Sequence, residues 1–131
     1  MHSNLDLVRD IYGAFAAGDV PRFLGHLDAA IVWNEAEGFA YSDRNPYVGP
    51  ESVIAGVIQR VLTDWRDFRV EVGEFAGSGD VVTMFGRYKA THGNSGKALD
   101  VQVAHTWWLR NGKAVRFQQM LDTAAAARAA S

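Results

Sequence analysis

The start of the chain has the hydrophobic spacing of two short helices. Apolar side chains recur every three or four residues, which predicts an amphipathic helix. They are Leu7, Val8, Ile11, Tyr12 and Phe15. Ser3 or Asn4 can cap the start of this helix, and Gly18 stands where a left-handed C-cap is expected. Asp19 is a second N-cap candidate in front of a short apolar segment, so a hairpin of two helices is expected.

A strand, a long loop and a third helix are predicted next. Residues 30–35 contain the β-prone run Ile-Val-Trp. Residues 36–48 are rich in Gly, Asp, Asn and Pro, and a loop of this length in a small protein is often functional. Pro50 stands in the first turn of the third helix. The apolar stripe of this helix consists of Ile54, Ile58, Val61 and Leu62.

β-prone runs dominate the rest of the chain. They cover residues 65–76, 81–91, 98–110 and 113–121. Turn-forming residues separate them, and Asn111-Gly112 favours a two-residue type I′ hairpin. We therefore expect an α+β fold, in which the three helices cover the concave face of an antiparallel meander. The chain is predicted to form one domain over residues 1–131, with a flexible or helical alanine-rich tail at 123–131.

The amino-acid composition argues against several kinds of partner and chemistry. The apolar share of 48% in 131 residues is enough for one core, and a net charge of -2 argues against nucleic acid and anionic membranes as partners. The absence of cysteine excludes disulfides and thiolate chemistry and fits a cytoplasmic protein. Residues 1–6 lack the basic and apolar regions of a targeting signal, and no apolar run is long enough to span a membrane.

Two ionisable residues fall on apolar strand faces. His105 alternates with Val103 and Trp107, and Glu35 shares its face with Trp33. Burial raises the pKa of a carboxyl group and an imidazole titrates near neutrality, so the pair can transfer protons at physiological pH. The alternatives are a hydrogen-bonded core histidine and a surface glutamate at a strand end. Only their convergence on one cavity would favour catalysis.

The register of the last two strands leaves one choice open. A two-residue turn places His105 opposite Gln118, whereas the alternation of the last strand turns Gln119 inward. A bulge would reconcile the two patterns, and both glutamines stay candidates for the pocket. Asp122 follows this strand and either reaches the rim of the pocket as a catalytic group or caps the terminal helix.

Aromatic side chains supply candidate pocket walls, although the same spacings also suit an ordinary core. These candidates are Tyr12, Trp33, Tyr88, Trp107 and Phe117. No residues have the spacing of metal ligands, so we expect neither a metal nor a cofactor. Gln102, Thr106 and Trp108 lie on the outer face of the predicted sheet, which favours either a homodimer through that face or simple edge packing.

Several segments, in order along the chain, resemble the nuclear-transport-factor-2-like superfamily, and within it the SnoaL-like and ketosteroid-isomerase-related proteins. They are Tyr12–Asp19, Trp33–Glu35, Tyr47–Val53, Ala104–Trp107, and Gly112–Gln119 with Leu121–Thr123. The resemblance implies a cone-shaped barrel of a strongly curved, mostly antiparallel sheet covered by three N-terminal helices. It does not specify one activity, because this superfamily includes isomerases, cyclases, epoxide hydrolases, dehydratases and non-catalytic binders.

The resemblance also suggests roles for individual residues. Glu35 falls at the position of the general-base aspartate of ketosteroid isomerases, and His105 at that of their oxyanion-binding aspartic acid. The oxyanion-binding tyrosine falls on Ile11, with Tyr12 beside it, and this departure argues against ketosteroid isomerisation itself. Similarity to SnoaL-like cyclases, which use acid–base histidine and aspartate, keeps His105 and Asp122 as candidates.

Three functions are consistent with these observations. The first is an isomerase, cyclase or lyase that moves a proton next to a carbonyl group in a hydrophobic compound, with Glu35 as base and His105 as donor. The second is a non-catalytic carrier of a small hydrophobic ligand. The third is a dimeric accessory module with a filled core. A cavity of about 300 Å³ or more, with Glu35 and His105 facing one point, would favour an enzyme or a carrier.

Overall fold

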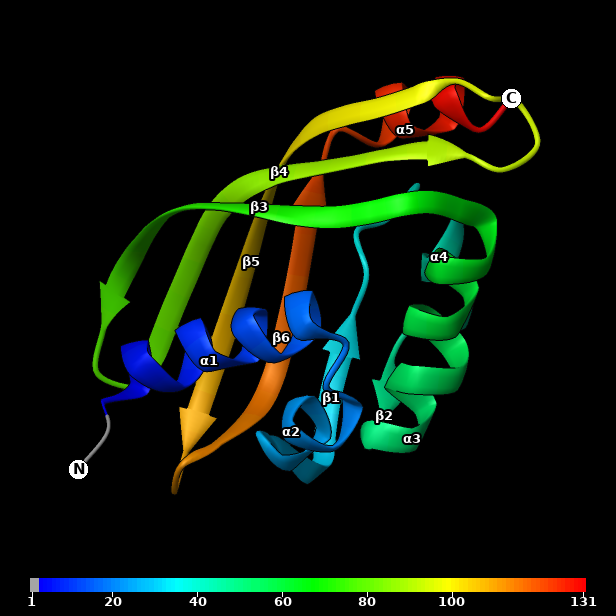
Figure 1. Ribbon diagram of the computed structural model, residues 1–131. Coiled ribbons are helices and arrows are strands. Elements are labelled where there is room, and N and C mark those ends of the chain that lie inside the picture. Colours follow the sequence, from blue (N-terminus) through cyan, green and yellow to red (C-terminus); the bar gives the residue numbers. More distant parts are fainter. Residues whose placement is uncertain (1–2) are drawn as a thin grey trace.

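The computed structural model describes residues 3–131 and forms a curved sheet with helices against its inner side (Figure 1). Met1 and His2, which begin the segment without a predicted targeting signal, lie outside the described residues. The helical segments are α1 (Asn4–Ala17), α2 (Val20–Gly25), η1 (Ala40–Arg44), α3 (Pro50–Val53), η2 (Ile54–Ile58), α4 (Gln59–Asp64) and α5 (Thr123–Ala129). The strands are β1 (Leu27–Asn34), β2 (Tyr47–Val48), β3 (Trp65–Ser78), β4 (Val81–His92), β5 (Ala98–Arg110) and β6 (Lys113–Leu121).

The six strands form one sheet in the order β2-β1-β6-β5-β4-β3. Strands β3 to β6 form the antiparallel meander that the sequence predicts. Strand β1 pairs with β6 in parallel, and the short strand β2 pairs with β1 inside the segment predicted as a loop. The segment predicted as a loop at 36–48 therefore contains the short helical turn η1 and ends in β2, and both elements are too short to have a recognisable hydrophobic period.

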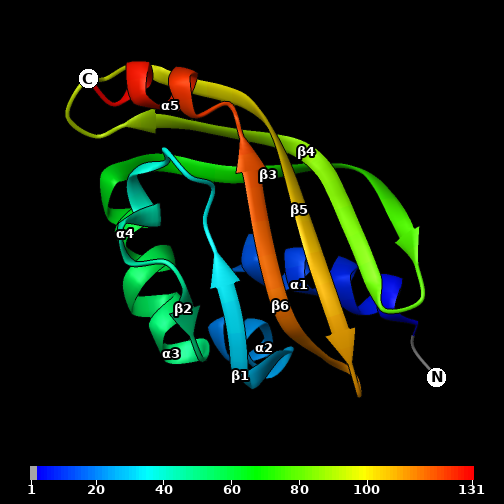
Figure 2. The ribbon, with the colours of Figure 1, turned by 180° about the vertical axis from the view of Figure 1, so that it is seen from behind.

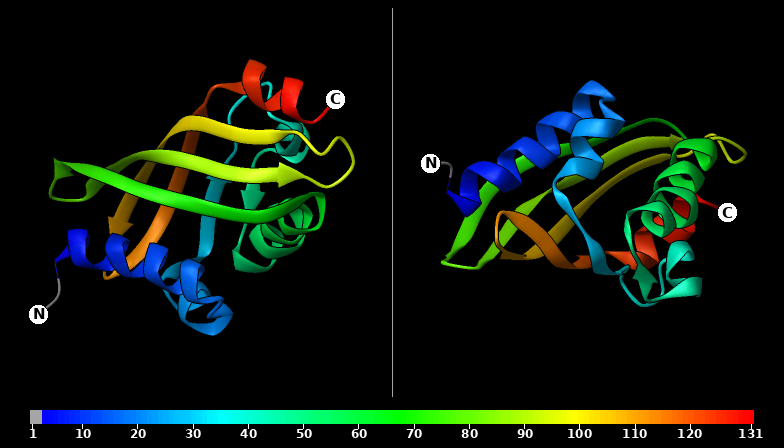
Figure 3. Two further views of the ribbon diagram at one scale, coloured as in Figure 1. Left: turned by 45° about the horizontal axis from the view of Figure 1, so that its top comes forward. Right: turned by 90° about the horizontal axis from the view of Figure 1, so that it is seen from below.

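Helices α1 and α2 and the segment from α3 to α4 lie on one side of the sheet (Figure 3). In the view from behind, strands β5 and β6 lie in front of α1 (Figure 2). The segment η2 is a π-helical turn that continues α3 into α4, so the predicted third helix is present with an irregular centre. Among the helices of residues 3–131, none is long and apolar enough to cross a bilayer.

Local signals in the sequence set the ends of the helices. The Ser3 hydroxyl accepts a hydrogen bond from the Asp6 backbone N–H, and Gly18 has a φ of 67° at the C-cap of α1. The Asp19 side chain accepts from the Arg22 backbone N–H at the start of α2. These caps satisfy backbone groups that a helix cannot pair internally, which confirms the predicted boundaries.

One extra residue shifts the register of the last hairpin. Arg110 pairs with Lys113 across the type I′ turn and Leu109 pairs with Ala114, as the two-residue turn predicts. Trp108 then pairs with Arg116, one residue further than the regular register would give. Strand β6 therefore has a bulge at residue 115, and beyond it His105 pairs with Gln119 rather than Gln118. The bulge reconciles the hairpin register with the alternation of the strand.

The sheet bends where two glycines face the neighbouring backbone. A β-carbon on Gly86 in β4 would collide with the carbonyl oxygen of Glu71, and one on Gly73 in β3 would collide with that of Phe85. The register between the two strands shifts next to this point, after Val72. Glycines and a bulge allow the backbones to approach closely, which lets the sheet curve around its inner face.

We expect Gly86→Ala to lower the free energy of unfolding by about 1–3 kcal/mol, because the new methyl group overpacks the bend. Urea unfolding followed by circular dichroism measures the change. Gly25→Ala is the matched control, since its β-carbon would meet no atom within 4 Å and its helix gains up to about 1 kcal/mol. Equal stability of Gly86→Ala and the wild type would contradict this account of the bend.

Candidate active site

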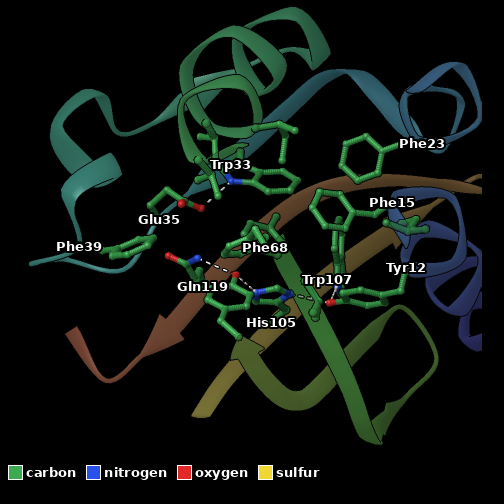
Figure 4. A pocket seen from close by; sticks show the side chains of 17 residues that line it. Tyr12, Phe15, Phe23, Trp33, Glu35, Phe39, Phe68, His105, Trp107 and Gln119 are labelled. Atoms are coloured by element: carbon green, nitrogen blue, oxygen red, sulfur yellow. Dashed lines mark hydrogen bonds between the residues drawn. The ribbon is translucent and has the colours of Figure 1, made fainter. Parts of the chain in front are cut away.

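A cavity lies between the concave face of the sheet and the helices (Figure 4). Its free volume is about 60 Å³, so the size of about 300 Å³ that would favour an enzyme or a carrier over a filled core is not reached, and the space holds only a small group. Most of its walls are apolar or aromatic. The lining residues are Ile11, Tyr12, Phe15, Phe23, Trp33, Glu35, Phe39, Val57, Ile58, Val61, Phe68, Val70, Tyr88, His105, Trp107, Phe117 and Gln119.

Glu35 follows the last residue of β1 and is only 2% exposed. Its backbone is held by Asn45, whose side chain accepts from the Glu35 N–H at 3.0 Å and donates to the Glu35 carbonyl at 2.8 Å. The Trp33 indole N–H donates to Glu35 Oε2 at 2.9 Å. Within residues 3–131, Glu35 Oε1 is the one buried side-chain oxygen or nitrogen without a hydrogen-bond partner. This oxygen is available to a ligand.

Burial raises the pKa of Glu35 to about 7, and the polar side chains of Trp33 and Gln119 beside it oppose part of that rise. At neutral pH the side chain is therefore divided between its protonated and ionised forms. A group in this condition can both accept and return a proton without a change of solution pH.

His105 in β5 is 5% exposed and lies between two tyrosines. The Tyr12 hydroxyl is 2.7 Å from Nδ1, and the Tyr88 hydroxyl is 2.5 Å from Nε2. Burial lowers the pKa of His105 to about 3, so the ring is neutral at physiological pH. Both ring nitrogens are thus occupied by hydroxyl groups, and His105 has no free N–H for a ligand.

The network around His105 contains one surplus hydroxyl hydrogen. Tyr12 accepts a hydrogen bond from the Trp107 indole at 2.9 Å, and Tyr88 accepts one from the Gln119 amide at 2.8 Å. A neutral imidazole donates through one nitrogen and accepts through the other, so one tyrosine donates to His105 while the other accepts from it. The hydrogen of the accepting hydroxyl is then free to bind an oxygen atom of a ligand. Burial raises the pKa of both tyrosines, which keeps them protonated.

Gln119 joins this network to the Glu35 segment. Its side-chain oxygen accepts from the Ala36 backbone N–H at 3.1 Å, while its amide donates to Tyr88. In Figure 4, Glu35, Gln119 and His105 follow one another along the cavity. Gln118 does not line the cavity, because the bulge in β6 turns its side chain to the other face of the sheet, where it is half-buried.

The structure brings together most of the residues singled out in the sequence. Besides Glu35, His105 and Gln119, the aromatic candidates Tyr12, Trp33, Tyr88, Trp107 and Phe117 all line the cavity. Asp122 does not, because it is exposed and its side chain caps α5 by accepting from the Ala125 N–H. Sequence reasoning missed Phe39, which stands in the long loop, and Phe68, which follows a positive-φ residue in β3. No periodic pattern marks either position.

Comparison with known protein families identifies the family of this chain. The model of the SnoaL-like domain matches residues 8–117, which is most of the chain. This protein belongs to the SnoaL-like family. No protein of curated function matches it significantly.

Similar solved structures match over nearly the whole chain. An NTF2-like protein from Burkholderia thailandensis is 29% identical with a TM-score of 0.94, and the match covers 100% of this chain and 99% of that chain. An NTF2-like protein from Burkholderia pseudomallei is 31% identical with a TM-score of 0.90, at the same coverage of 100% and 99%. TerC, co-crystallised with polyporic acid, is 24% identical with a TM-score of 0.86 over 97% of both chains, and shows the fold alone. The predicted α+β fold and family are confirmed.

The pKa of Glu35 predicts how the stability of this SnoaL-like protein depends on pH. Because the folded-state pKa of about 7 exceeds the ordinary value of 4.5, Glu35 contributes stability below pH 4.5 that is lost as the pH rises to 7. Glu35→Gln removes this titration. The free energy of unfolding of Glu35→Gln minus that of the wild type should therefore increase by on the order of 3 kcal/mol as the pH rises from about 4 to about 8.

Urea unfolding of both proteins at the two pH values measures this difference. The comparison cancels the opposite contribution of His105, which both proteins retain. Glu37→Gln is the control, since Glu37 is exposed two residues further along the chain. If Glu35→Gln and the wild type have parallel pH profiles, Glu35 does not titrate in the cavity as described.

Proposed function

We propose that this SnoaL-like protein is an acid–base enzyme that moves a proton at a carbon atom next to a carbonyl group in a small hydrophobic compound. The observation that carries the proposal is the unpartnered, buried Oε1 of Glu35 in the same apolar cavity as the tyrosine pair on His105. A buried acceptor without a partner lowers the free energy of unfolding by about 1–3 kcal/mol. Such a destabilising group is expected at a site where a ligand supplies the missing hydrogen bond.

The proposed step uses side chains of this chain only. The Glu35 carboxylate takes the α-proton, the C–H electrons form the carbon–carbon double bond of an enolate, and the negative charge develops on the carbonyl oxygen. The free hydroxyl hydrogen of Tyr12 or Tyr88 donates to that oxygen, while His105 holds both tyrosines in place. Protonated Glu35 then returns the proton to the same or to another carbon atom.

This assignment changes the role expected for His105 from donor to positioning residue, because both of its nitrogens are engaged by tyrosines. The apolar walls favour a hydrophobic substrate, in keeping with the co-crystallised polyporic acid of TerC, which has the same fold. A carrier of such a ligand would have the same walls and would need neither the raised pKa of Glu35 nor the surplus hydroxyl hydrogen.

Exchange of α-protons for deuterium in cyclic enones and polyketide-like ketones, followed by NMR, tests the proposal. We expect exchange by the wild type and a loss of at least about 100-fold in Glu35→Gln, since the amide cannot accept the proton. Asp122→Asn is the matched control, because an asparagine can still cap α5 and the residue lies outside the cavity. Binding without exchange would favour a carrier, and exchange by Glu35→Gln would exclude Glu35 as the base.

We further propose a homodimer through the outer face of the sheet. Phe85 is 48% exposed and Met120 is 60% exposed, and both line a shallow hollow on that face. Trp108, the residue that first suggested this surface, is partly covered by the Arg116 guanidinium, 4.1 Å from the ring centroid. Large exposed apolar side chains on a broad sheet favour an interface.

Light scattering of the double variant Phe85→Glu and Met120→Glu should give the mass of a monomer where the wild type gives that of a dimer. In a dimer, the two introduced glutamates would be buried in the interface without a charged partner, which disfavours association. Val20→Glu, at a similarly exposed position on α2, should remain dimeric. A monomeric wild type would contradict the proposal directly.

A further inference from the structure

A second hollow, larger than the Glu35 cavity, lies beneath helix α5. Its volume is about 360 Å³, and it is bordered by the segment from Gly38 to Tyr41, the junction of α4 with β3, and α5. In Figure 1, α5 lies at the same end of the sheet as the start of β3. Its walls include the rings of Tyr41 and Trp65 and the small side chains of Ala126 and Ala127. Such walls suit a flat hydrophobic group.

Phe39 separates this hollow from the Glu35 cavity. It lines both spaces and is only 6% exposed, so its side chain is the partition between them. On the side of the second hollow, its ring packs edge-on against Tyr41 with the centroids 5.1 Å apart. On the other side it lies near Glu35 (Figure 4). The two spaces therefore meet at Phe39.

Helix α5 contacts neighbouring segments of the chain at both of its ends. Gly38, with a φ of 88°, lies against Thr123 at the start of α5, where a β-carbon would be 3.3 Å from the threonine hydroxyl. At the other end of α5, the Ser95 hydroxyl donates to the Ala129 carbonyl at 2.5 Å. The start of α5 therefore packs close to Gly38, and a hydrogen bond from Ser95 holds its end.

Polar groups occur at one side of this hollow. The Tyr41 hydroxyl donates to Asp64 Oδ2 at 2.7 Å and accepts from the Trp65 indole at 3.2 Å. The tyrosine is therefore satisfied, while the Asp64 carboxylate is exposed at the border of the hollow. His92, whose ring packs edge-on against Trp65, and Thr123 also line the hollow, so a ligand group in this space would meet aromatic rings and alanine methyl groups together with these few polar side chains.

We infer that the hollow beneath α5 is the distal half of the substrate site, and that the substrate is an elongated hydrophobic carbonyl compound with two lobes. Its carbonyl ring occupies the Glu35 cavity, and its second, aromatic lobe displaces the Phe39 ring and lies beneath α5. This inference rests on the proposed function. It explains how a cavity of about 60 Å³ can serve a ligand larger than a single small ring.

The binding of two compounds tests the inference: cyclohexenone, and the cyclohexenone that carries a phenyl group on the ring carbon opposite the carbonyl. We expect the phenyl compound to bind the wild type at least about tenfold more tightly, because the phenyl ring is buried beneath α5. Titration of alanine-methyl-labelled protein by NMR measures both affinities. The methyl signals of Ala126 and Ala127 should shift with the phenyl compound and not with cyclohexenone.

Ala127→Trp should fill the hollow and remove this tenfold gain while it leaves the binding of cyclohexenone within about twofold. Ala127 is exposed, so the larger side chain does not disturb the core. Ala124→Trp is the matched control, because Ala124 is exposed on the same helix and does not line the hollow. Phe39→Leu, which has a smaller side chain between the two spaces, should strengthen binding of the phenyl compound by a few fold.

Failure of this inference differs from failure of the proposed function. A phenyl gain that survives Ala127→Trp, or equal affinity for the two compounds, including no binding of either, would overturn the two-lobed site. Binding that behaves as expected without any deuterium exchange would retain the two-lobed site and reject the enzyme. Exchange by the wild type, together with equal affinity of the wild type for the two compounds, would retain the enzyme and reject the distal half.

Discussion

Strands β3 and β4 can bend sharply because Gly73 and Gly86 let their backbones approach more closely than β-carbons would permit. The bend makes the inner face of the sheet concave, and a helix is too straight to fill a concave surface completely. The helices therefore cover the sheet and leave a hollow lined mainly by aromatic rings. The environment of Glu35, His105 and Gln119 depends on that hollow, because its apolar walls separate these side chains from water.

Burial has opposite consequences for the two ionisable side chains in the hollow. His105 is neutral and has a tyrosine on each nitrogen, so its polar atoms are satisfied. Glu35 has a partner for one oxygen only, and burial brings its pKa to about 7. The hydrogen-bonded network around His105 is suited to present a tyrosine hydroxyl group, whereas the less satisfied carboxyl group of Glu35 is suited to exchange a proton.

The SnoaL-like fold itself does not define a reaction, and the chemistry depends on the particular side chains that a chain places in its hollow. In this chain Tyr12 and Tyr88 occupy both ring nitrogens of His105, and the proposed function therefore assigns the donor role to one of these tyrosines. Phe39 lines both the Glu35 cavity and the larger hollow beneath α5, so in the proposed two-lobed site this one ring would set the size of the ligand.

The sequence by itself determined the features that depend on neighbouring residues. Hydrophobic period, helix caps and the Asn111-Gly112 turn are local, so they predicted the helices and the four-stranded meander, and the alternation of polar and apolar positions singled out Glu35 and His105. Tertiary structure alone decided that a bulge in β6 turns Gln119 rather than Gln118 inward, and that Tyr12, 93 residues away in the chain, contacts His105. Such contacts depend on how distant segments pack, and no local pattern carries that information.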